Sequence, residues 1–530
     1  MMEKTTAYVN AKIYTMENDG AACEAIAVRG GRFVYCGSSE QAAAMADDVI
    51  DLQGKTVIPG LIDTHIHLFP YACNLERLLL DKVTSVRELQ EKLRDYAKNV
   101  PAGEWIYGFG FDNERFTDDK SLPTKEVLDA ACPDHKVVIG RWCMHFFSAN
   151  SAALAAAGID RNFKPEVEGT ALFGEDGEPT GVLSDASGLK VVSLMPDAYA
   201  TLEAKADVLE KAIRELNKKG FTGAHPVQAR HVNLPEYMAA YQKLKDEGRL
   251  NARLYYATDD LEELKAHRGE GDELLRYGYY KVFLDGGLGG RSAAMIEPYC
   301  DDPGNTGVLN YTQEGLTEEL RKAYSLGIQT GTHVIGDKAC EMLTNSIETL
   351  LREDPQPDPR IRMIHLEVAT EDVLQRIRKL PVVIDAEPLY MDTDAAWIED
   401  RIGAARMPYA NAWGRMLREG VVVTSGSDAP GLDEDPWLGI YCCVTRCDQH
   451  GWPEGGSCPE NKMSVYDAVC TYTKYAAYDS FEEEIKGTIT PGKLADFLVL
   501  DRDIFTVEPE AIKDTRVLKT VLGGRTVYEA

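Results

Sequence analysis

The sequence predicts an α/β protein: a (β/α)8 TIM barrel with a small β-sandwich built from both termini and an inserted lobe after the first barrel strand. Three observations predict this fold. Apolar, strand-like runs alternate with helix-like segments through the middle of the chain. Short alternating runs punctuated by glycine occur at both ends. The stretch between the first two barrel strands is too long for one crossover.

The terminal segments have the pattern of short antiparallel strands. Residues 7–14, 25–28 and 32–36 are separated by glycines, and a matching pattern covers residues 496–500, 517–522 and 526–528. Two terminal β segments of like character suggest a single sandwich. We therefore expect residues 1–56 and 487–530 to form one β-sandwich domain.

The barrel domain is expected over residues 57–486. Helical patterns lie between its strands, such as Leu202–Lys219, which Gly220 ends, and Thr370–Lys379. Eight βα units suit closure into a barrel. The eight strand candidates are 57–68, 221–227, 252–257, 280–285, 327–334, 361–366, 381–387 and 420–425.

The inserted lobe is expected over residues 70–200. Ser85 and Glu88 form a capping box before a helix, and Asn150 begins an alanine-rich helix that Gly158 ends. An insertion after the first strand emerges at the carboxyl ends of the barrel strands, where active sites lie. We therefore expect this lobe to cover the active site.

Composition excludes several classes of function. The 530 residues carry 57 basic and 86 acidic side chains, and the net charge of −29 repels nucleic acid and anionic lipid. No apolar run is long enough to cross a bilayer, and the first residues lack a secretory signal, so we expect a cytoplasmic protein. The 12 cysteines are too dilute for a disulfide scaffold. Cys442, Cys443 and Cys447 lack the second Cys/His pair of a structural zinc site.

The most informative feature is the pair His65 and His67, at the end of the first barrel strand. Side chains two residues apart on a strand share a face, so both imidazoles can bind one metal ion. Two packed core histidines are the alternative. The position favours the metal, because barrel enzymes place their active sites at the carboxyl ends of the strands.

Later strand candidates end in, or contain, further polar residues. The distance from Lys281 to His333, and from there to His365, fits one βα unit each, and the distance on to Asp428 fits two. The predicted strand at 381–387 belongs to the extra βα unit between His365 and Asp428. The alternatives are a buried ion pair for Lys281 and a turn or helix N-cap for Asp428.

These residues and their flanking motifs resemble the amidohydrolase superfamily of metal-dependent hydrolases, and most closely its YtcJ-like branch, which includes the N-substituted formamide deformylases. The resemblance covers nearly the whole chain. The motifs are Pro59-Gly-Leu-Ile-Asp-Thr-His-Ile-His67, Gly103-Glu-Trp-Ile-Tyr-Gly-Phe-Gly110, Lys281-Val-Phe-Leu-Asp-Gly286, His333-Val-Ile-Gly-Asp337, Gly426-Ser-Asp-Ala-Pro430 and Gly487-Thr-Ile-Thr-Pro-Gly-Lys-Leu-Ala-Asp496.

The resemblance implies one or two divalent metal ions, with Zn²⁺ the first choice. It implies that His65 and His67 bind the more buried ion, that Lys281 bridges two ions, that His333 and His365 bind the second, and that Asp428 completes the set. An ammonium group has no lone pair, so Lys281 would need conversion by CO2 to a carbamate. Metal-activated water would then attack a C–N bond, and Asp428 would carry the proton to the departing nitrogen.

Four further residues are candidates for substrate binding. Trp142 and His145 lie in the expected lobe, in a stretch that resembles a family segment, and packing is an equal alternative for both. His225 ends the second barrel strand and could face the pocket mouth. Arg291 could contact an anion from the glycine-rich segment 285–292, which lacks the Gly-Lys-Ser/Thr ending of a phosphate loop.

The function implied is hydrolysis of an amide, of N-acyl or N-formyl type, in a small-molecule substrate. A cyclic C–N hydrolase or heterocycle deaminase of the same superfamily is the alternative, and a non-catalytic binding protein is the third. Nucleic acid and membranes are not expected partners. The substrate, the metal and the subunit number stay open, with a homodimer as one option.

Overall fold

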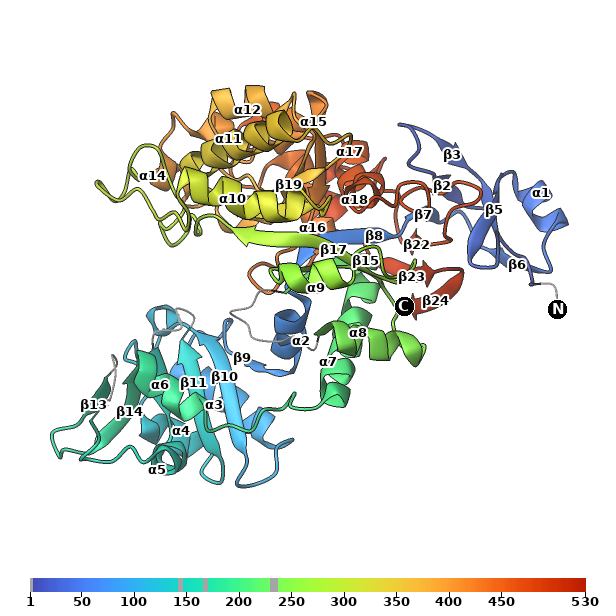
Figure 1. The fold of residues 1–530 in the computed structure, drawn as a ribbon. Helices are drawn as coiled ribbons and strands as arrows, with labels where there is room; N and C mark the ends of the chain where they lie inside the picture. The colour runs from blue at the N-terminus through green and yellow to red at the C-terminus, as the bar shows by residue number, and fades with distance from the viewer. Residues whose placement is uncertain (1–2, 142–145, 165–169, 229–236) are drawn as a thin grey trace. The chain divides into compact units, whose positions relative to one another are not determined.

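The computed structural model describes residues 3–141, 146–164, 170–228 and 237–530. The chain divides into two compact units, one formed by residues 1–71 and 205–530 and the other by residues 72–204. The predicted fold class is confirmed: a parallel barrel, two terminal β-sheets and an inserted unit are all present (Figure 1).

The barrel sheet contains eight strands in the order β21-β20-β19-β18-β17-β16-β15-β8. All seven ladders between neighbours are parallel. Each predicted run overlaps one of these strands, although β15, β16 and β17 extend beyond their runs. The strands are β8 (Leu61–Ile66), β15 (Phe221–Gln228), β16 (Arg253–Thr258), β17 (Leu275–Phe283), β18 (Thr330–Val334), β19 (Ile361–His365), β20 (Val382–Ala386) and β21 (Val422–Ser425).

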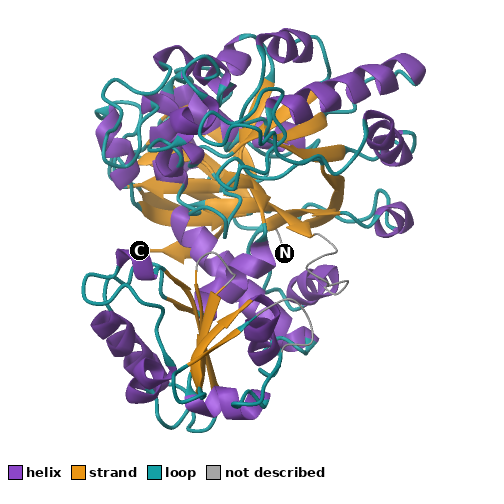
Figure 2. Ribbon diagram, turned by 90° about the vertical axis from the view of Figure 1, so that its left-hand side faces the viewer, coloured by secondary structure: helices purple, strands orange, loops and turns teal. Residues whose placement is uncertain are grey.

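Helices follow the strands and lie outside them, as a βα barrel requires (Figures 1 and 2). The helix predicted at Leu202–Lys219 is present with those bounds, and Thr370 caps another by accepting a hydrogen bond from the Val373 N–H. These outer helices include α7 (Leu202–Lys219), α8 (Tyr237–Asp246), α9 (Leu261–Ala266), α10 (Gln313–Tyr324), α11 (Asp337–Glu353), α12 (Glu371–Ile377), α15 (Trp413–Arg418), α16 (Pro436–Thr445) and α18 (Lys474–Asp479).

The run at 57–68 is not one strand, which corrects the expectation. It divides into β7 (Thr56–Pro59), in a terminal sheet, and β8, in the barrel. Gly60 makes the break. A Cβ on Gly60 would lie 2.2 Å from Oγ1 of Thr222, so only glycine lets the chain pass this close to β15.

Two terminal sheets combine strands from both ends of the chain. One has the order β5-β4-β1-β6 and the other β24-β23-β22-β7-β2-β3. They share a core in which Tyr8 packs edge-on against Phe497, with ring centroids 4.9 Å apart. The strands are β1 (Thr6–Val9), β2 (Lys12–Tyr14), β3 (Ala22–Cys23), β4 (Ala25–Arg29), β5 (Arg32–Gly37), β6 (Asp48–Asp51), β22 (Phe497–Leu500), β23 (Val517–Leu522) and β24 (Arg525–Glu529).

The unit at 72–204 has its own six-stranded sheet, in the order β13-β14-β12-β11-β10-β9, and its own apolar cores (Figure 2). Its predicted caps are present: Ser85 accepts a hydrogen bond from the Glu88 N–H, and α5 (Ser151–Ala157) runs from Asn150 to a left-handed Gly158. That this unit covers the active site stays a prediction. The other elements are β9 (Leu78–Leu79), β10 (Trp105–Phe111), β11 (Lys136–Arg141), β12 (Phe146–Ala149), β13 (Ala171–Phe173), β14 (Pro179–Ser184), α3 (Val86–Ala97), α4 (Lys125–Ala131) and α6 (Asp185–Val192).

Over the described ranges, we find no helix with the length and apolar character needed to span a bilayer. The cysteines in those ranges are all free thiols. Cys442 and Cys447 direct their Sγ atoms at backbone carbonyls.

Candidate metal centre

The barrel brings the predicted ligands to one end of its sheet. Each lies at or just beyond the carboxyl end of a strand, where parallel strands present their side chains together. His65 is in β8 and His67 follows it, Lys281 is in β17, His333 is in β18, His365 ends β19, and Asp428 follows β21.

His65, His67 and Asp428 form one cluster. Oδ1 of Asp428 lies 3.5 Å from Nε2 of His65 and 3.4 Å from Nε2 of His67. One ligand atom from each of the three residues lies within 4.8 Å of the others. The two rings are almost perpendicular, at 87°. Two imidazole nitrogens and a carboxylate oxygen at this spacing can hold one divalent ion.

His333 and His365 form a second pair of donors. Nε2 of His365 lies 2.9 Å from Nδ1 of His333. Nε2 of His333 lies 3.4 Å from the Gly286 carbonyl oxygen. A carbonyl oxygen accepts only from a protonated nitrogen, so this contact favours a proton on Nε2 and a lone pair on Nδ1. Metal–nitrogen bonds of about 2.0–2.1 Å allow Nε2 of His365 and Nδ1 of His333 to bind one ion. The ring of His365 lies 5.5 Å from that of His65, centroid to centroid, so the two groups of donors adjoin.

Lys281 lies beside an imidazole and a phenyl ring in the barrel interior. Its Nζ is 3.3 Å from Nε2 of His65 and 4.8 Å from the centroid of the Phe283 ring. Burial lowers the pKa of Lys281 to about 8, so part of the amine is unprotonated near neutral pH. No carboxylate in the described residues forms an ion pair with it, so the ion-pair alternative has no partner there.

Burial also keeps the histidines neutral. It holds the pKa of His65 and of His365 well below the usual value and lowers the pKa of His333 to about 4. A neutral imidazole offers a lone pair to a metal, whereas an imidazolium does not. At neutral pH all three rings are therefore competent ligands.

Two of these ligands have unusual backbone angles. His365 has a φ of 75° and Asp428 a φ of 52°, both in the left-handed region that non-glycine residues rarely adopt. Neighbouring groups hold them there: Nε1 of Trp413 donates to the His365 carbonyl at 2.9 Å, and the Asp428 N–H donates to the His65 carbonyl at 2.7 Å. Such strain is typical of functional sites.

Three buried acids that support the centre were not predicted from the sequence. Asp63 accepts hydrogen bonds from the His65 and Ser427 N–H groups, and Asp285 accepts three from backbone N–H groups around Gly336. Glu387 follows β20, and its Oε2 lies 2.8 Å from Nδ1 of His365. Asp63 lies within β8, whereas Asp285 and Glu387 come after the ends of β17 and β20.

The four residues predicted to bind substrate are His225, Arg291, Trp142 and His145. His225 is fully buried, with Nδ1 3.3 Å from Arg362 and 3.5 Å from Asp479, so it meets charged groups inside the barrel. Arg291 is paired with Asp301 through two hydrogen bonds of 3.1 and 2.8 Å. Trp142 and His145 lie outside the described residues.

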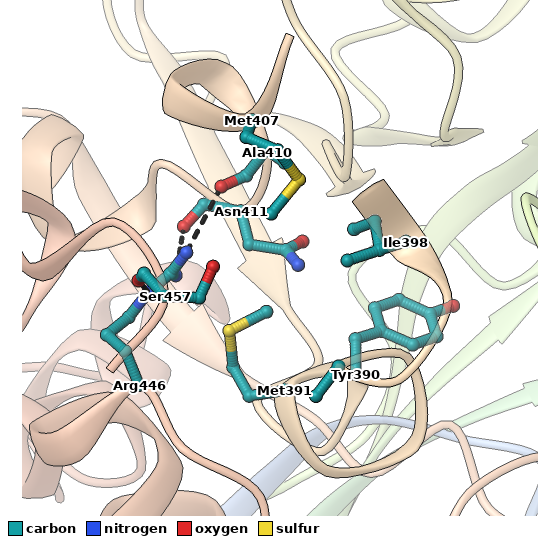
Figure 3. A pocket seen from close by; sticks show the side chains of 9 residues that line it. Tyr390, Met391, Ile398, Met407, Ala410, Asn411, Arg446 and Ser457 are labelled. Carbon is teal, nitrogen blue, oxygen red and sulfur yellow. Dashed lines mark hydrogen bonds between the residues drawn. The ribbon is translucent and has the colours of Figure 1, made fainter. Parts of the chain in front are cut away.

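Tyr390, whose hydroxyl lies 3.4 Å from Nδ1 of His365, also lines a small cavity (Figure 3). Met391, Ile398 and Met407 form its apolar wall, and the amide of Asn411 points into it. Its volume of about 10 Å³ corresponds to about one water molecule. It is too small to hold a substrate.

The residues present fit a divalent metal. They supply neutral imidazoles in two adjoining groups and a carboxylate, which suit Zn²⁺ and similar ions. The buried carboxylate of Glu387 makes no hydrogen bond with any described residue, although burying such a charge alone is costly. A cation at the neighbouring histidines would balance it.

Comparisons with known proteins agree with this geometry. A family model described as "Amidohydrolase family" matches residues 48–528. The chain is 33% identical to the putative amidohydrolase YtcJ of Bacillus subtilis and 26% identical to an N-substituted formamide deformylase of Arthrobacter pascens, each over 98% of both chains. The crystal structure of an uncharacterized metal-dependent hydrolase from Pyrococcus horikoshii matches with a TM-score of 0.78 and 27% identity, covering 95% of this chain and 99% of that one. The predicted YtcJ-like branch is confirmed.

Proposed function

Since the chain belongs to the amidohydrolase family, and so is a metal-dependent hydrolase of carbon–nitrogen bonds, we propose that it cleaves an acyclic amide of N-acyl or N-formyl type. The observation that carries the proposal is the convergence of His65, His67 and Asp428 beside the His333–His365 pair. The full-length match to a protein named as an N-substituted formamide deformylase supports this bond type.

The metal we propose is Zn²⁺, as one or two ions. When bound, such an ion would polarise the carbonyl and make a water molecule more acidic. His65 and His67 would hold one ion, and His333 and His365 the other. Lys281, as a carbamate formed with CO2, would supply a shared carboxylate, and its burial favours the unprotonated amine that this reaction needs.

Asp428 is the proposed proton carrier. Its Oδ1 lies against both His65 and His67, so it borders the space where a water molecule would be held. There Asp428 would take the proton of the attacking water and pass it to the departing nitrogen. A carboxylate can do both steps only if it is within hydrogen-bond reach of both atoms.

Hydrolysis of a cyclic C–N bond, or deamination of a heterocycle, remains the second candidate because the same donors would serve it. The products separate the two reactions. Acyclic amides give a carboxylate and a free amine, whereas deamination releases ammonia.

The test combines metal analysis with a substrate screen. Purified protein should contain one or two Zn²⁺ per chain and should hydrolyse some N-formyl or N-acyl amines in a panel that also includes cyclic ureides. His65→Ala and His67→Ala should each lose metal and turnover. His267→Ala is the matched control, because that ring stacks on Tyr277, away from the centre. Full activity in the His65 and His67 variants would refute the metal mechanism.

A further inference from the structure

Glu387 is an acidic side chain that directly contacts His365 of the His333–His365 pair. It follows β20, the seventh barrel strand, and its side chain is completely buried. Oε2 lies 2.8 Å from Nδ1 of His365. None of the motifs that indicate the metal centre includes this residue.

The surroundings of Glu387 give it no structural purpose. In the described part of the chain, neither carboxylate oxygen makes a well-aligned hydrogen bond, and the nearby negative charges of Asp428, Asp385 and Asp63 are opposed by Lys281. A buried carboxylate without donors lowers the stability of a fold. A residue that costs stability in this way is expected to serve the site.

We propose that Glu387 is a positioning residue that holds His365 in the tautomer with its proton on Nδ1, leaving the Nε2 lone pair for a metal ion; this inference rests on the proposed function. When ionised, the Glu387 carboxylate can only accept a hydrogen bond, so it favours a proton on the nitrogen that faces it. Nε2 is the nitrogen that lies 2.9 Å from Nδ1 of His333. Because Nε2 of His333 faces the Gly286 carbonyl, the Nδ1 of His333 keeps its lone pair, and the tautomer that Glu387 favours in His365 directs a second lone pair at the same space.

Tyr390 is the competing partner. Its hydroxyl lies 3.4 Å from the same Nδ1 of His365. A hydroxyl both donates and accepts, so it adapts to either tautomer and selects neither. Glu387, which is closer and only accepts, decides the proton position.

The experiment measures Zn²⁺ affinity, by competition with a chromophoric chelator, for the full-length protein stripped of metal. Glu387→Met keeps the length of the side chain but removes the acceptor, and should weaken Zn²⁺ binding about 10- to 100-fold. Glu387→Gln keeps an acceptor oxygen and should recover part of that loss. Tyr390→Phe should change affinity much less. Asp392→Asn is the matched control, because this carboxylate accepts hydrogen bonds from Gln449 and none from the predicted ligands in the described residues.

A double-mutant cycle shows whether Glu387 acts through His365. In a His365→Ala background, Glu387→Met should cause no further loss of Zn²⁺ affinity. The visible absorption spectrum of the Co²⁺-loaded protein should change with Glu387→Met but not with Asp392→Asn. Metal-free Glu387→Met should melt no lower than metal-free wild type, because it removes a buried charge.

The outcomes separate this inference from the proposed function. If wild type neither binds Zn²⁺ nor hydrolyses amides, the proposed function fails. If wild type does both and Glu387→Met binds Zn²⁺ equally well, only the role of Glu387 fails. A larger loss in Tyr390→Phe than in Glu387→Gln would assign the tautomer to Tyr390. An equal loss with and without His365 would make Glu387 a packing residue.

Discussion

Asp63 joins the first strand of the barrel to the segment after the last, because its Oδ1 accepts a hydrogen bond from the Ser427 N–H at 3.0 Å. The same oxygen accepts from the His65 N–H at 3.1 Å. In the described structure no ladder pairs β8 with β21, the two ends of the sheet order. Side chains and a backbone hydrogen bond from the Asp428 N–H to the His65 carbonyl close this seam, and Thr64 also reaches Thr424 across it at 3.1 Å. The seam is the place where His65, His67 and Asp428 meet.

Removing the Asp63 carboxylate should affect both stability and metal binding. Asp63→Ala leaves two buried N–H groups without an acceptor, at about 1–3 kcal/mol each. We expect a lower unfolding free energy by urea denaturation and weaker Zn²⁺ binding, since Asp63 fixes the backbone of a ligand. Asp51→Ala is the control: Asp51 accepts one backbone hydrogen bond on the surface. Equal effects of the two substitutions would contradict a role of Asp63 in holding the seam and the backbone of His65.

Gly60 separates the terminal sheets from the barrel, and its replacement tests that boundary. In Gly60→Ala the new methyl group would lie 2.2 Å from Oγ1 of Thr222, so we expect a loss of about 1–3 kcal/mol from overpacking. Thr222→Ala in the same chain should recover only part, because its Cβ still lies 2.8 Å away. Gly287→Ala, with open space around it, serves as control. A melting temperature unchanged by Gly60→Ala would show that this backbone relaxes freely.

Local signals in the sequence were sufficient for the elements of the fold. The strands of the barrel are apolar on both faces, which a parallel sheet covered by helices requires, and so they stand out as continuous runs. Caps such as Asn150 with Gly158 depend on neighbouring residues only. The division at Gly60 was missed because it depends on Thr222, which is far away in the sequence.

The candidate site could be predicted only in part for the same reason. A histidine at a strand end is visible in the sequence, but the partner of its second nitrogen is not. Glu387 reaches His365 across two adjacent strands, and His225 meets Arg362 across the barrel interior. Such pairs depend on strand register, which one sequence does not give. The buried acids were therefore found only in the structure.

Lys281 should be replaceable by an external carboxylate if its carbamate joins the ions. Lys281→Ala should lose metal content and turnover, because the shared ligand is gone. Short carboxylic acids such as acetate should restore part of the activity in a concentration-dependent way. His65→Ala, which lacks an imidazole instead, should not respond to the same acids. Wild-type kinetics in Lys281→Ala would reject a role for this amine.

The buried pair of Arg362 and Asp479 in the barrel interior should make stability depend on pH. Arg362 is fully buried and lies 3.0 Å from Oδ2 of Asp479, and it also donates to the Thr64 carbonyl at 2.7 Å. Burial raises the pKa of Asp479 to about 6, above its ordinary value of 3.8. The native state therefore holds this proton more tightly than the unfolded state, and the associated stability is lost as pH rises from 4 to 6.

The measurement compares wild type with Asp479→Asn by urea denaturation at several pH values. Asparagine does not titrate, so the unfolding free energy of wild type minus that of the variant should fall between pH 4 and 6, by about 3 kcal/mol at most. Glu371→Gln should show the opposite sign, because a hydrogen bond from Arg415 lowers the pKa of Glu371 to about 2. Its stabilising contribution is lost as pH falls from 4.5 to about 2. A difference for Asp479→Asn that is flat or rises with pH would mean that Arg362 outweighs burial and keeps this carboxylate ionised.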